Sequence, residues 1–303
     1  LTVARRRKIP FVVSIHGGVY DLAQQVRREL EPVHTGGIEW GKIFGLLVRS
    51  RRLLDDADAI LTGNPREAEL IRERHPRTRV LVQPYGVDTA AYRVDHRAVA
   101  RAAFPWLAGA RVLLVVSRIS AVKNQGWLVD RLPALLRREP RTMVVCVGAS
   151  TEPAYSATLE KHVRELGLGG RVKLLGGLPT GDPRLIGLMQ LARAMVLPSH
   201  AETFGMVILE AWAAGTPMLA SVTAGSRSLI THGVNGVLFD LNRPLAFNEA
   251  ALTALRDDGW RASVTAVARN RVEREFDTKV IAGQVKSLYE ELIHERRGVA
   301  RGA

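Results

Sequence analysis

Six short apolar runs, separated by segments long enough for a helix or for a turn and a helix, occupy the last two thirds of the chain. These runs are Val112–Ser117, Thr142–Val147, Val172–Leu175, Ala194–Leu197, Pro217–Ser221 and Val237–Phe239. Short runs without polar alternation are typical of strands that are buried on both faces of a parallel sheet. Right-handed crossovers between such strands predict a doubly wound α/β sheet, in which ligands bind at the carboxyl ends of the strands. We therefore expect functional residues in the loops that follow these runs.

The earlier part of the chain has fewer elements. The expected strands are Phe11–Ile15, Ala57–Leu61 and Val80–Val82, and the expected helices are Glu39–Leu54 and Asn64–Arg74. Three strands are few for a separate doubly wound domain, since a sheet has about five or six strands on average. The chain has no initiator Met, and Leu1–Lys8 is typical of the end of a helix. We therefore expect the start of this domain to be missing.

A turn signal at Pro84-Tyr85-Gly86 opens a segment of mixed character between the two parts. The sequence predicts a partial, Rossmann-like N-terminal domain at residues 1–100 and a second domain at residues 101–276. A periodic segment at residues 277–294 predicts a terminal helix that packs back on the N-terminal domain. Residues 295–303 are expected to form a frayed tail.

Composition limits the class of protein. Hydrophobic residues make up 47% of the chain and charged residues 24%, which are values of a globular protein. No apolar run approaches the roughly 20 residues of a membrane span, and no signal peptide is evident, so we expect a cytoplasmic protein. The single cysteine, Cys146, excludes an internal disulfide, and its apolar neighbours indicate a core residue rather than a catalytic thiol.

The formal net charge is +13, which would suit an anionic partner. The arginines are scattered along the chain instead of forming one basic run with aromatic neighbours, so we expect no nucleic-acid partner. One segment, Gly41–Leu54, is basic on one side and apolar on the other. It is either a helix packed on a sheet, which is the commoner case, or a peripheral contact with the inner face of an anionic membrane.

Two cations follow the strand Val112–Ser117. Arg118 and Lys123 lie five residues apart in the segment SRISAVKN, at the carboxyl end of the expected strand. A forked guanidinium and a flexible ammonium in one loop can together bind a diphosphate. The alternative is an ordinary charged surface loop.

Two carboxylates belong to the next strand–loop–helix unit. Glu202 lies in the loop before an expected helix at Gly205–Ala214, whose free N–H groups favour anions. Glu210 lies within that helix among apolar residues, where a carboxylate costs free energy unless it has partners. The alternatives are that Glu202 is a helix cap and that Glu210 is an exposed residue of the helix face.

The segment Pro198–Pro217, PSHAETFGMVILEAWAAGTP, resembles the E-x7-E signature of the retaining glycosyltransferases of family 4, which have the GT-B fold. Weaker similarities follow the order of that family. They are SIHGG (Ser14–Gly18), YGVD (Tyr85–Asp88), SRISAVKNQG (Ser117–Gly126) and NGVLF (Asn235–Phe239). The chain departs from the family pattern at Tyr85, where Asn is usual, at Ser228, where Glu is usual, and in lacking the Gly-rich loop of the first strand.

The resemblance implies two Rossmann-like domains that face a cleft, the N-terminal one incomplete, and assigns roles to single residues. Arg118 and Lys123 would stabilise the leaving diphosphate, and Glu202 would hold hydroxyls of the donor sugar. Glu210 would bind the ribose. The remaining implied contacts are the backbone of Phe204, Gly205 and Met206 with sugar and phosphate, the loop Gly176, Gly177 and Leu178 with the base, and His16 with the sugar and the acceptor. For His16 the alternative is a core histidine at a strand end.

By this resemblance the chain is expected to be a hexosyltransferase of polysaccharide or cell-envelope synthesis, moving a sugar from a nucleoside diphosphate with retention of configuration. The acceptor is unknown. The family needs no metal, and the sequence has no spacing typical of metal ligands. The alternative is a truncated remnant that binds nucleotide sugars without turnover.

Overall fold

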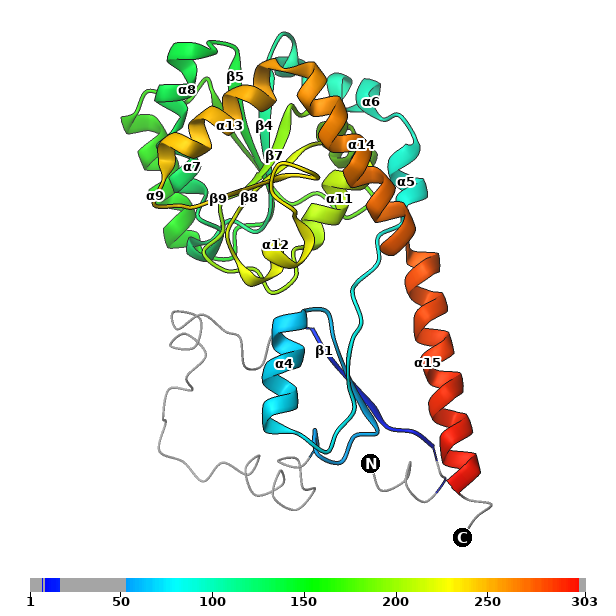
Figure 1. The fold of residues 1–303 in the computed structure, drawn as a ribbon. Coiled ribbons are helices and arrows are strands. Elements are labelled where there is room, and N and C mark those ends of the chain that lie inside the picture. The colour runs from blue at the N-terminus through cyan, green and yellow to red at the C-terminus, as the bar shows by residue number, and fades with distance from the viewer. Residues whose placement is uncertain (1–6, 8, 17–52, 300–303) are drawn as a thin grey trace, which may run out of the picture. The chain divides into compact units, whose positions relative to one another are not determined.

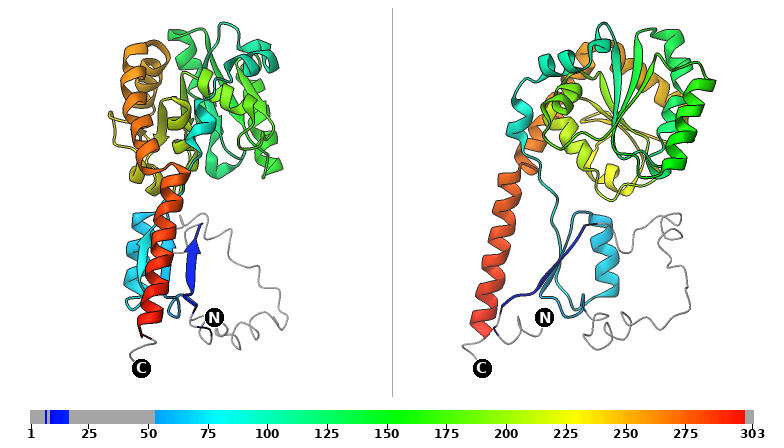
Figure 2. Two further views of the ribbon diagram at one scale, coloured as in Figure 1. Left: turned by 90° about the vertical axis from the view of Figure 1, so that its right-hand side faces the viewer. Right: turned by 180° about the vertical axis from the view of Figure 1, so that it is seen from behind.

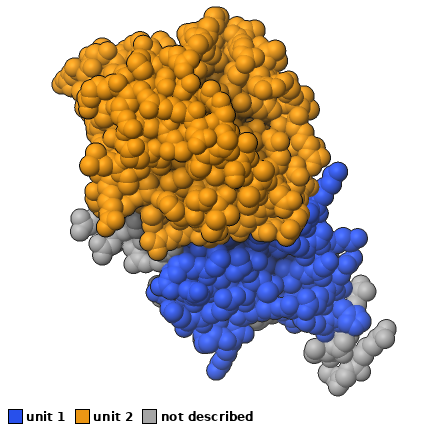
Figure 3. All heavy atoms as spheres, turned by 45° about the horizontal axis from the view of Figure 1, so that its top comes forward, with its two compact units in different colours: residues 1–85, 279–303 blue, residues 86–278 orange. Residues whose placement is uncertain are grey.

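The computed structural model describes residues 7, 9–16 and 53–299 of the chain (Figure 1). The expected helix Glu39–Leu54, the amphipathic segment Gly41–Leu54 and the glycines of SIHGG lie almost wholly outside the described residues. The chain forms two compact units, which are coloured separately in Figure 3. Unit 1 combines Leu1–Tyr85 with Lys279–Ala303, and unit 2 is Gly86–Thr278.

Unit 2 is built on a six-stranded parallel sheet. Its strands are β4 (Arg111–Val116), β5 (Thr142–Val147), β6 (Val172–Leu175), β7 (Ala194–Leu197), β8 (Met218–Ser221) and β9 (Val237–Phe239). They lie side by side in the order β6-β5-β4-β7-β8-β9, and every pair is parallel. This is the strand order of the doubly wound dinucleotide-binding fold. The expected α/β class is confirmed, and all six expected strands are present within a residue at either end.

Helices cover both faces of this sheet (Figure 2). They are α5 (Thr89–Arg93), α6 (Arg97–Ala103), α7 (Gln125–Val129), α8 (Leu132–Arg138), α9 (Pro153–Glu165), α10 (Pro183–Leu191), α11 (Met206–Ala214), α12 (Ala224–Leu229), α13 (Pro244–Arg256) and α14 (Asp258–Glu275), with short 3-10 turns at Pro105–Leu107 and Ala121–Lys123. The start of α10 shows why helices begin where they do. Pro183 occupies its first turn, and the Asp182 carboxylate accepts a hydrogen bond from the N–H of Arg184 at 2.8 Å.

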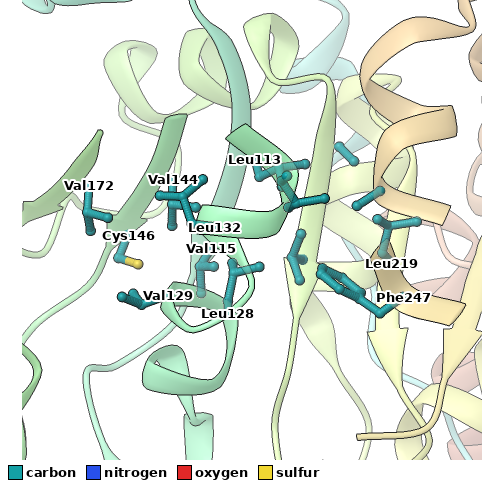
Figure 4. Packing of buried hydrophobic residues seen from close by; sticks show 14 of the residues in the cluster. Leu113, Val115, Leu128, Val129, Leu132, Val144, Cys146, Val172, Leu219 and Phe247 are labelled. Atoms are coloured by element: carbon teal, nitrogen blue, oxygen red, sulfur yellow. The ribbon is translucent and has the colours of Figure 1, made fainter. Parts of the chain in front are cut away.

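The core of unit 2 explains the apolar runs. Because side chains alternate along a strand, Leu113 and Val115 of β4 reach one face, where they pack with Leu128 and Phe247 from the covering helices (Figure 4). Leu114 is equally buried, and α10 contacts β4 while α11 contacts β8. Both faces of the sheet are thus buried, which is why its strands show no alternation of polar and apolar residues. Cys146 is fully buried in this cluster, as the sequence predicted.

The division between the units falls after Tyr85, earlier than the boundary expected from the sequence at residue 100. The reason is packing, since α5 contacts α11 and α6 contacts α10. The amide nitrogen of Gln190 in α10 also donates to the carbonyl oxygens of Tyr92 at 3.0 Å and of Val94 at 2.7 Å. From Gly86 onward, the segment of mixed character therefore belongs to unit 2.

Unit 1 contains a parallel sheet in the order β1-β2-β3, formed by β1 (Val12–Ile15), β2 (Ala59–Thr62) and β3 (Val80–Val82). Helix α4 (Pro65–Arg74) connects β2 to β3 and packs Ala68 and Ile71 against Ile60. The expected strands and the expected helix Asn64–Arg74 are all present, with Asn64 as the cap of α4.

The last helix, α15 (Thr278–Val299), runs beyond His294, so most of the expected tail is helical. Its Leu288 and Leu292 pack against Ala59 and Leu61 of β2. Because α15 packs against the sheet of unit 1, this helix belongs to unit 1 from Lys279 on.

Candidate donor site in unit 2

The strand order of the unit 2 sheet reverses between β4 and β7. In doubly wound sheets ligands bind at such a switch point, outside the carboxyl ends of the strands. Two loops begin there, the β4 loop (residues 117–124) and the β7 loop (residues 198–205). They contain Arg118, Lys123 and Glu202, which the sequence placed in separate loops.

The β4 loop carries two cations in different surroundings. Arg118 is exposed, and its guanidinium has no partner among the described residues. The side chain of Lys123 is only 17% exposed. The side-chain amide of Gln125 shapes the loop by donating to the hydroxyl of Ser117 at 3.0 Å and to the carbonyl of Arg118 at 2.7 Å. The loop therefore presents one free and one partly buried positive charge.

Lys123 and Glu202 form an ion pair across the switch point. The Lys123 ammonium lies 2.5 Å from the Glu202 carboxylate, whose side chain is 11% exposed. The same carboxylate oxygen accepts a hydrogen bond from the hydroxyl of buried Ser199 at 2.8 Å. The N–H of His200 donates to the carbonyl of Val122 at 2.8 Å, so the two loops are also joined through their backbones. Glu202 is held from both loops and is not a helix cap.

The β7 loop ends at the start of α11 in a close-packed turn. Gly205 has φ of 93°, a left-handed conformation that favours glycine, and it is buried with Phe204, while Met206 is exposed. A Cβ at Gly225 would lie 2.7 Å from the backbone nitrogen of Phe204, so only glycine allows this approach. The Gly225 N–H donates to the Glu202 carbonyl at 2.8 Å. The first N–H groups of α11 have no partner within the helix and favour an anion.

Glu210 is half-buried on α11 and has a partner that the sequence did not predict. The hydroxyl of Tyr92, on α5, interacts with the Glu210 carboxylate. Burial raises the pKa of Glu210, and the interaction with Tyr92 partly offsets the rise. Burial, followed by the nearby Glu210 charge, raises the pKa of Tyr92. Glu210 is therefore not the exposed helix-face residue of the alternative interpretation.

The glycines expected to contact a base lie at the edge strand. Gly176 and Gly177 follow β6 and are exposed, and Leu178 is partly exposed. A Cβ at Gly177 would lie 3.4 Å from the backbone nitrogen of Ala149 in the loop after β5. The sheet order places β6 two strands from β4, which at about 4.8 Å per strand is roughly 10 Å.

His16 belongs to unit 1, whereas the other candidate residues belong to unit 2. It follows β1 and is exposed, so it is not a core histidine. Its Nδ1 lies 3.0 Å from the hydroxyl of Tyr85, and the two rings stack with centroids 5.3 Å apart. Tyr85, which stands where the family pattern has Asn, thus orients the His16 ring.

Three residues of the site were not predicted. Ser199 holds Glu202, Tyr92 holds Glu210, and Gly148 lets the loop after β5 approach the β4 loop. A Cβ at Gly148 would lie 1.8 Å from the carbonyl oxygen of Ser117. A glycine directly after an apolar strand was the available signal for Gly148, whereas nothing in the local sequence connects Tyr92 with Glu210.

Among the described residues there is no group of three or more His, Cys, Asp or Glu side chains that could hold a metal ion. In the same part of the chain, no helix combines the length and the apolar character that crossing a membrane requires.

Comparisons with known proteins identify the family of the chain. The family model of the group 1 glycosyl transferases matches residues 97–271, which is more than half of the chain. The D-inositol 3-phosphate glycosyltransferase of Thermobispora bispora is 33% identical over 261 residues, covering 83% of this chain and 60% of the relative. That of Xylanimonas cellulosilytica is 32% identical over 260 residues, covering 83% and 61%. The chain thus spans about 60% of the length of these relatives.

Solved structures show the same fold. Anabaena Alr3699/HepE, solved with UDP and glucose, superposes with a TM-score of 0.77 at 22% identity, covering 96% of this chain and 74% of the other. Sucrose-phosphate synthase of Thermosynechococcus elongatus gives 0.72 at 24% identity, covering 97% and 71%. These likenesses confirm the GT-B fold, with a small first sheet. The match of the family model shows that the chain belongs to the group 1 glycosyl transferases.

Proposed function

We propose that the switch point of unit 2 binds a nucleoside diphosphate sugar and that the protein transfers its sugar to an acceptor with retention of configuration. The observation that carries the proposal is the Lys123–Glu202 pair, a cation and a carboxylate joined across the two loops where a doubly wound sheet binds ligands. The D-inositol 3-phosphate glycosyltransferases among the relatives and the UDP complex of Alr3699/HepE support a donor of this class.

Four groups of the β4 loop are assigned to the diphosphate in this proposal. Arg118 and Lys123 would neutralise the charge that develops on it as the bond from the anomeric carbon to the phosphate oxygen breaks. Two further groups of the β4 loop fit this role, because the buried hydroxyl of Ser120 and the buried amide nitrogen of Asn124 have no hydrogen-bond partner among the described residues. Buried polar groups are normally satisfied, so a phosphate oxygen is a suitable missing partner.

The sugar and the nucleoside are assigned to carboxylates and to loop backbone. Glu202 would accept hydrogen bonds from sugar hydroxyls while Lys123 turns toward the phosphate. Glu210 would bind the ribose, with Phe204, Gly205 and Met206 orienting sugar and phosphate through the backbone. The base would lie against the loop of Gly176, Gly177 and Leu178.

The acceptor side is assigned to unit 1. In the transfer, the acceptor oxygen bonds to the anomeric carbon on the face that the diphosphate leaves, and the acceptor proton passes to the diphosphate. His16, oriented by Tyr85, would touch the sugar and position the acceptor. A cytoplasmic location and a peripheral contact of Gly41–Leu54 with an anionic membrane stay predictions, and absence of binding to anionic liposomes would contradict the second.

Transfer and hydrolysis of UDP- and GDP-sugars test the proposal, with the protein compared with its Glu202→Ala and Lys123→Ala variants and with Arg137→Gln. Arg137 is an exposed arginine in the last turn of α8, and it serves as the matched control. Glu202→Ala and Lys123→Ala are expected to lose activity, whereas Arg137→Gln is expected to keep it. Full activity in both would refute the assignment, and donor binding without any turnover would favour the binding-module alternative.

A further inference from the structure

A second concave site lies at the opposite edge of the unit 2 sheet. The cavity measures about 520 Å³ and lies where β4 and β7 begin, since Ala110, Val112 and Arg193 line it. β4 is six residues long, which at about 3.3 Å per residue puts roughly 20 Å of strand between this cavity and the β4 loop. The cavity is therefore separate from the proposed donor site.

Four guanidinium groups line this cavity. Arg97 and Arg101 come from α6, Arg193 directly precedes β7, and Arg261 comes from the first turn of α14. Within the described parts of the chain, no carboxylate is among the lining residues. Arginine presents paired N–H donors that match phosphate or carboxylate oxygens, so the lining predicts an anionic ligand.

Two of these arginines share one carboxylate. Arg193 and Arg261 both form ion pairs with Asp258, the second at 2.9 Å, and Asp258 is 73% exposed whereas the two arginine side chains are 25% and 22% exposed. Burial, together with the neighbouring charges of Arg193 and Arg111, lowers the pKa of Arg261. Arg111 is itself paired with Glu139 at 2.9 Å. One carboxylate, that of Asp258, thus serves two guanidinium groups, which leaves one positive charge of this pair uncompensated.

The two arginines of α6 likewise have only one carboxylate partner between them. Arg97 is paired with Asp95 at 2.8 Å. Arg101 is exposed and has no partner in the part of the chain that the structure describes. Four guanidinium groups facing two carboxylates leave two positive charges at the cavity.

Apart from the four arginines and Gln190, the lining is apolar. Phe104, Leu107 and Leu191 contribute to the wall, and the loop through Gly109 is open, since a Cβ on that glycine would meet nothing within 4 Å. The volume falls in the range of about 300–1,000 Å³ that is typical of small-molecule sites. The site therefore combines room for a ring with charge for an anion.

We propose that this cavity binds a small phosphate monoester whose organic part is an aromatic or other apolar ring. A monoester carries about −1.5 to −2 charges at neutral pH, which matches the two uncompensated positive charges. The phosphate contacts Arg101, Arg193 and Arg261, and the ring lies against Phe104 and Leu191. This site does not depend on the proposed transfer reaction.

Phenyl phosphate and inorganic phosphate are the probes. Calorimetry gives the dissociation constants, and backbone amide NMR shifts locate the site. The matched variants are Arg101→Gln and Arg137→Gln, each of which replaces an exposed arginine in the last turn of a short helix. Lys123→Ala serves as the donor-site variant.

Phenyl phosphate is expected to bind more tightly than inorganic phosphate and to shift the amides of Gly109 and Ala110. Arg101→Gln should weaken its binding at least about fivefold, whereas Arg137→Gln and Lys123→Ala leave it unchanged. Equal losses in the two glutamine variants would show general charge attraction and overturn the proposal. The proposal would also be overturned if Lys123→Ala lost the binding of phenyl phosphate, if the two probes bound equally well, or if the amide of Gly109 did not shift.

Discussion

Replacing Lys123 with Met removes one partner of the Lys123–Glu202 pair and leaves a carboxylate that is 11% exposed without its cation. Losing one partner of a fully buried pair costs about 3–5 kcal/mol, because the remaining charge stays desolvated. Glu202 keeps some solvent contact and the hydrogen bond from Ser199, so we expect a cost of about 2 kcal/mol in the free energy of unfolding of unit 2. With a urea m-value of about 2 kcal/mol/M, the unfolding midpoint should fall by about 1 M.

A double-mutant cycle separates the pair from the rest of the site. Glu202→Gln leaves the Lys123 ammonium without a carboxylate and should also destabilise, whereas Lys123→Met combined with Glu202→Gln removes both charges. The double variant should therefore cost about 1–2 kcal/mol less than the sum of the single variants.

Tryptophan fluorescence in urea is a suitable assay, because four of the five tryptophans belong to unit 2. They are Trp106, Trp127, Trp212 and Trp260. Additive costs within about 0.5 kcal/mol would refute the ion pair as an energetic unit.

Three further outcomes follow from the structure of unit 2. Gly148→Ala should destabilise unit 2 by more than about 3 kcal/mol, because its Cβ would lie 1.8 Å from the Ser117 carbonyl oxygen; a urea midpoint close to that of the unchanged protein would contradict this close approach. The pKa of Glu210 is raised above 4.5 in the folded protein, so its contribution to stability is complete below pH 4.5 and is lost as the pH rises through the folded-state pKa. Glu210→Gln should therefore flatten the decline of the urea midpoint above pH 4.5. An unchanged slope would exclude Glu210 as the source of that decline. Burial raises the pKa of the Cys146 thiol to about 12, so iodoacetamide at pH 8 should label it in urea but not in the folded protein, as mass spectrometry can show; rapid labelling of the folded protein would mean that the core around β5 opens.

Much of unit 2 could be predicted from the sequence because its strands are buried on both faces. A run such as Thr142–Val147 has no other stable environment than the middle of a covered sheet, and its bounds in the structure are those expected. The loops after β4 and β7 could be recognised for the same reason, since the order of strands and helices fixes which loops follow carboxyl ends. Arg118, Lys123 and Glu202 were placed in these loops in this way, and their roles stay predictions.

What the sequence did not show depends on contacts between distant segments. Tyr92 meets Glu210 because α5 packs on α11, and this packing also moves the division between the units to Tyr85. The basic cavity joins α6 with residues that precede β7 and open α14. No local sequence pattern predicts such contacts, because they depend on how the helices pack on the sheet.

In the proposed function, the switch point between β4 and β7 holds the diphosphate of the donor. Calorimetric binding of UDP to the protein, to Arg118→Gln and to Arg137→Gln tests it most directly, since both variants remove one exposed arginine without a partner among the described residues. Arg118→Gln is expected to weaken UDP binding by about tenfold, through the loss of a charge-assisted contact of about 1.5 kcal/mol, and Arg137→Gln is expected to have no effect. Equal affinity of the protein and both variants for UDP would show that Arg118 does not bind the diphosphate at this switch point.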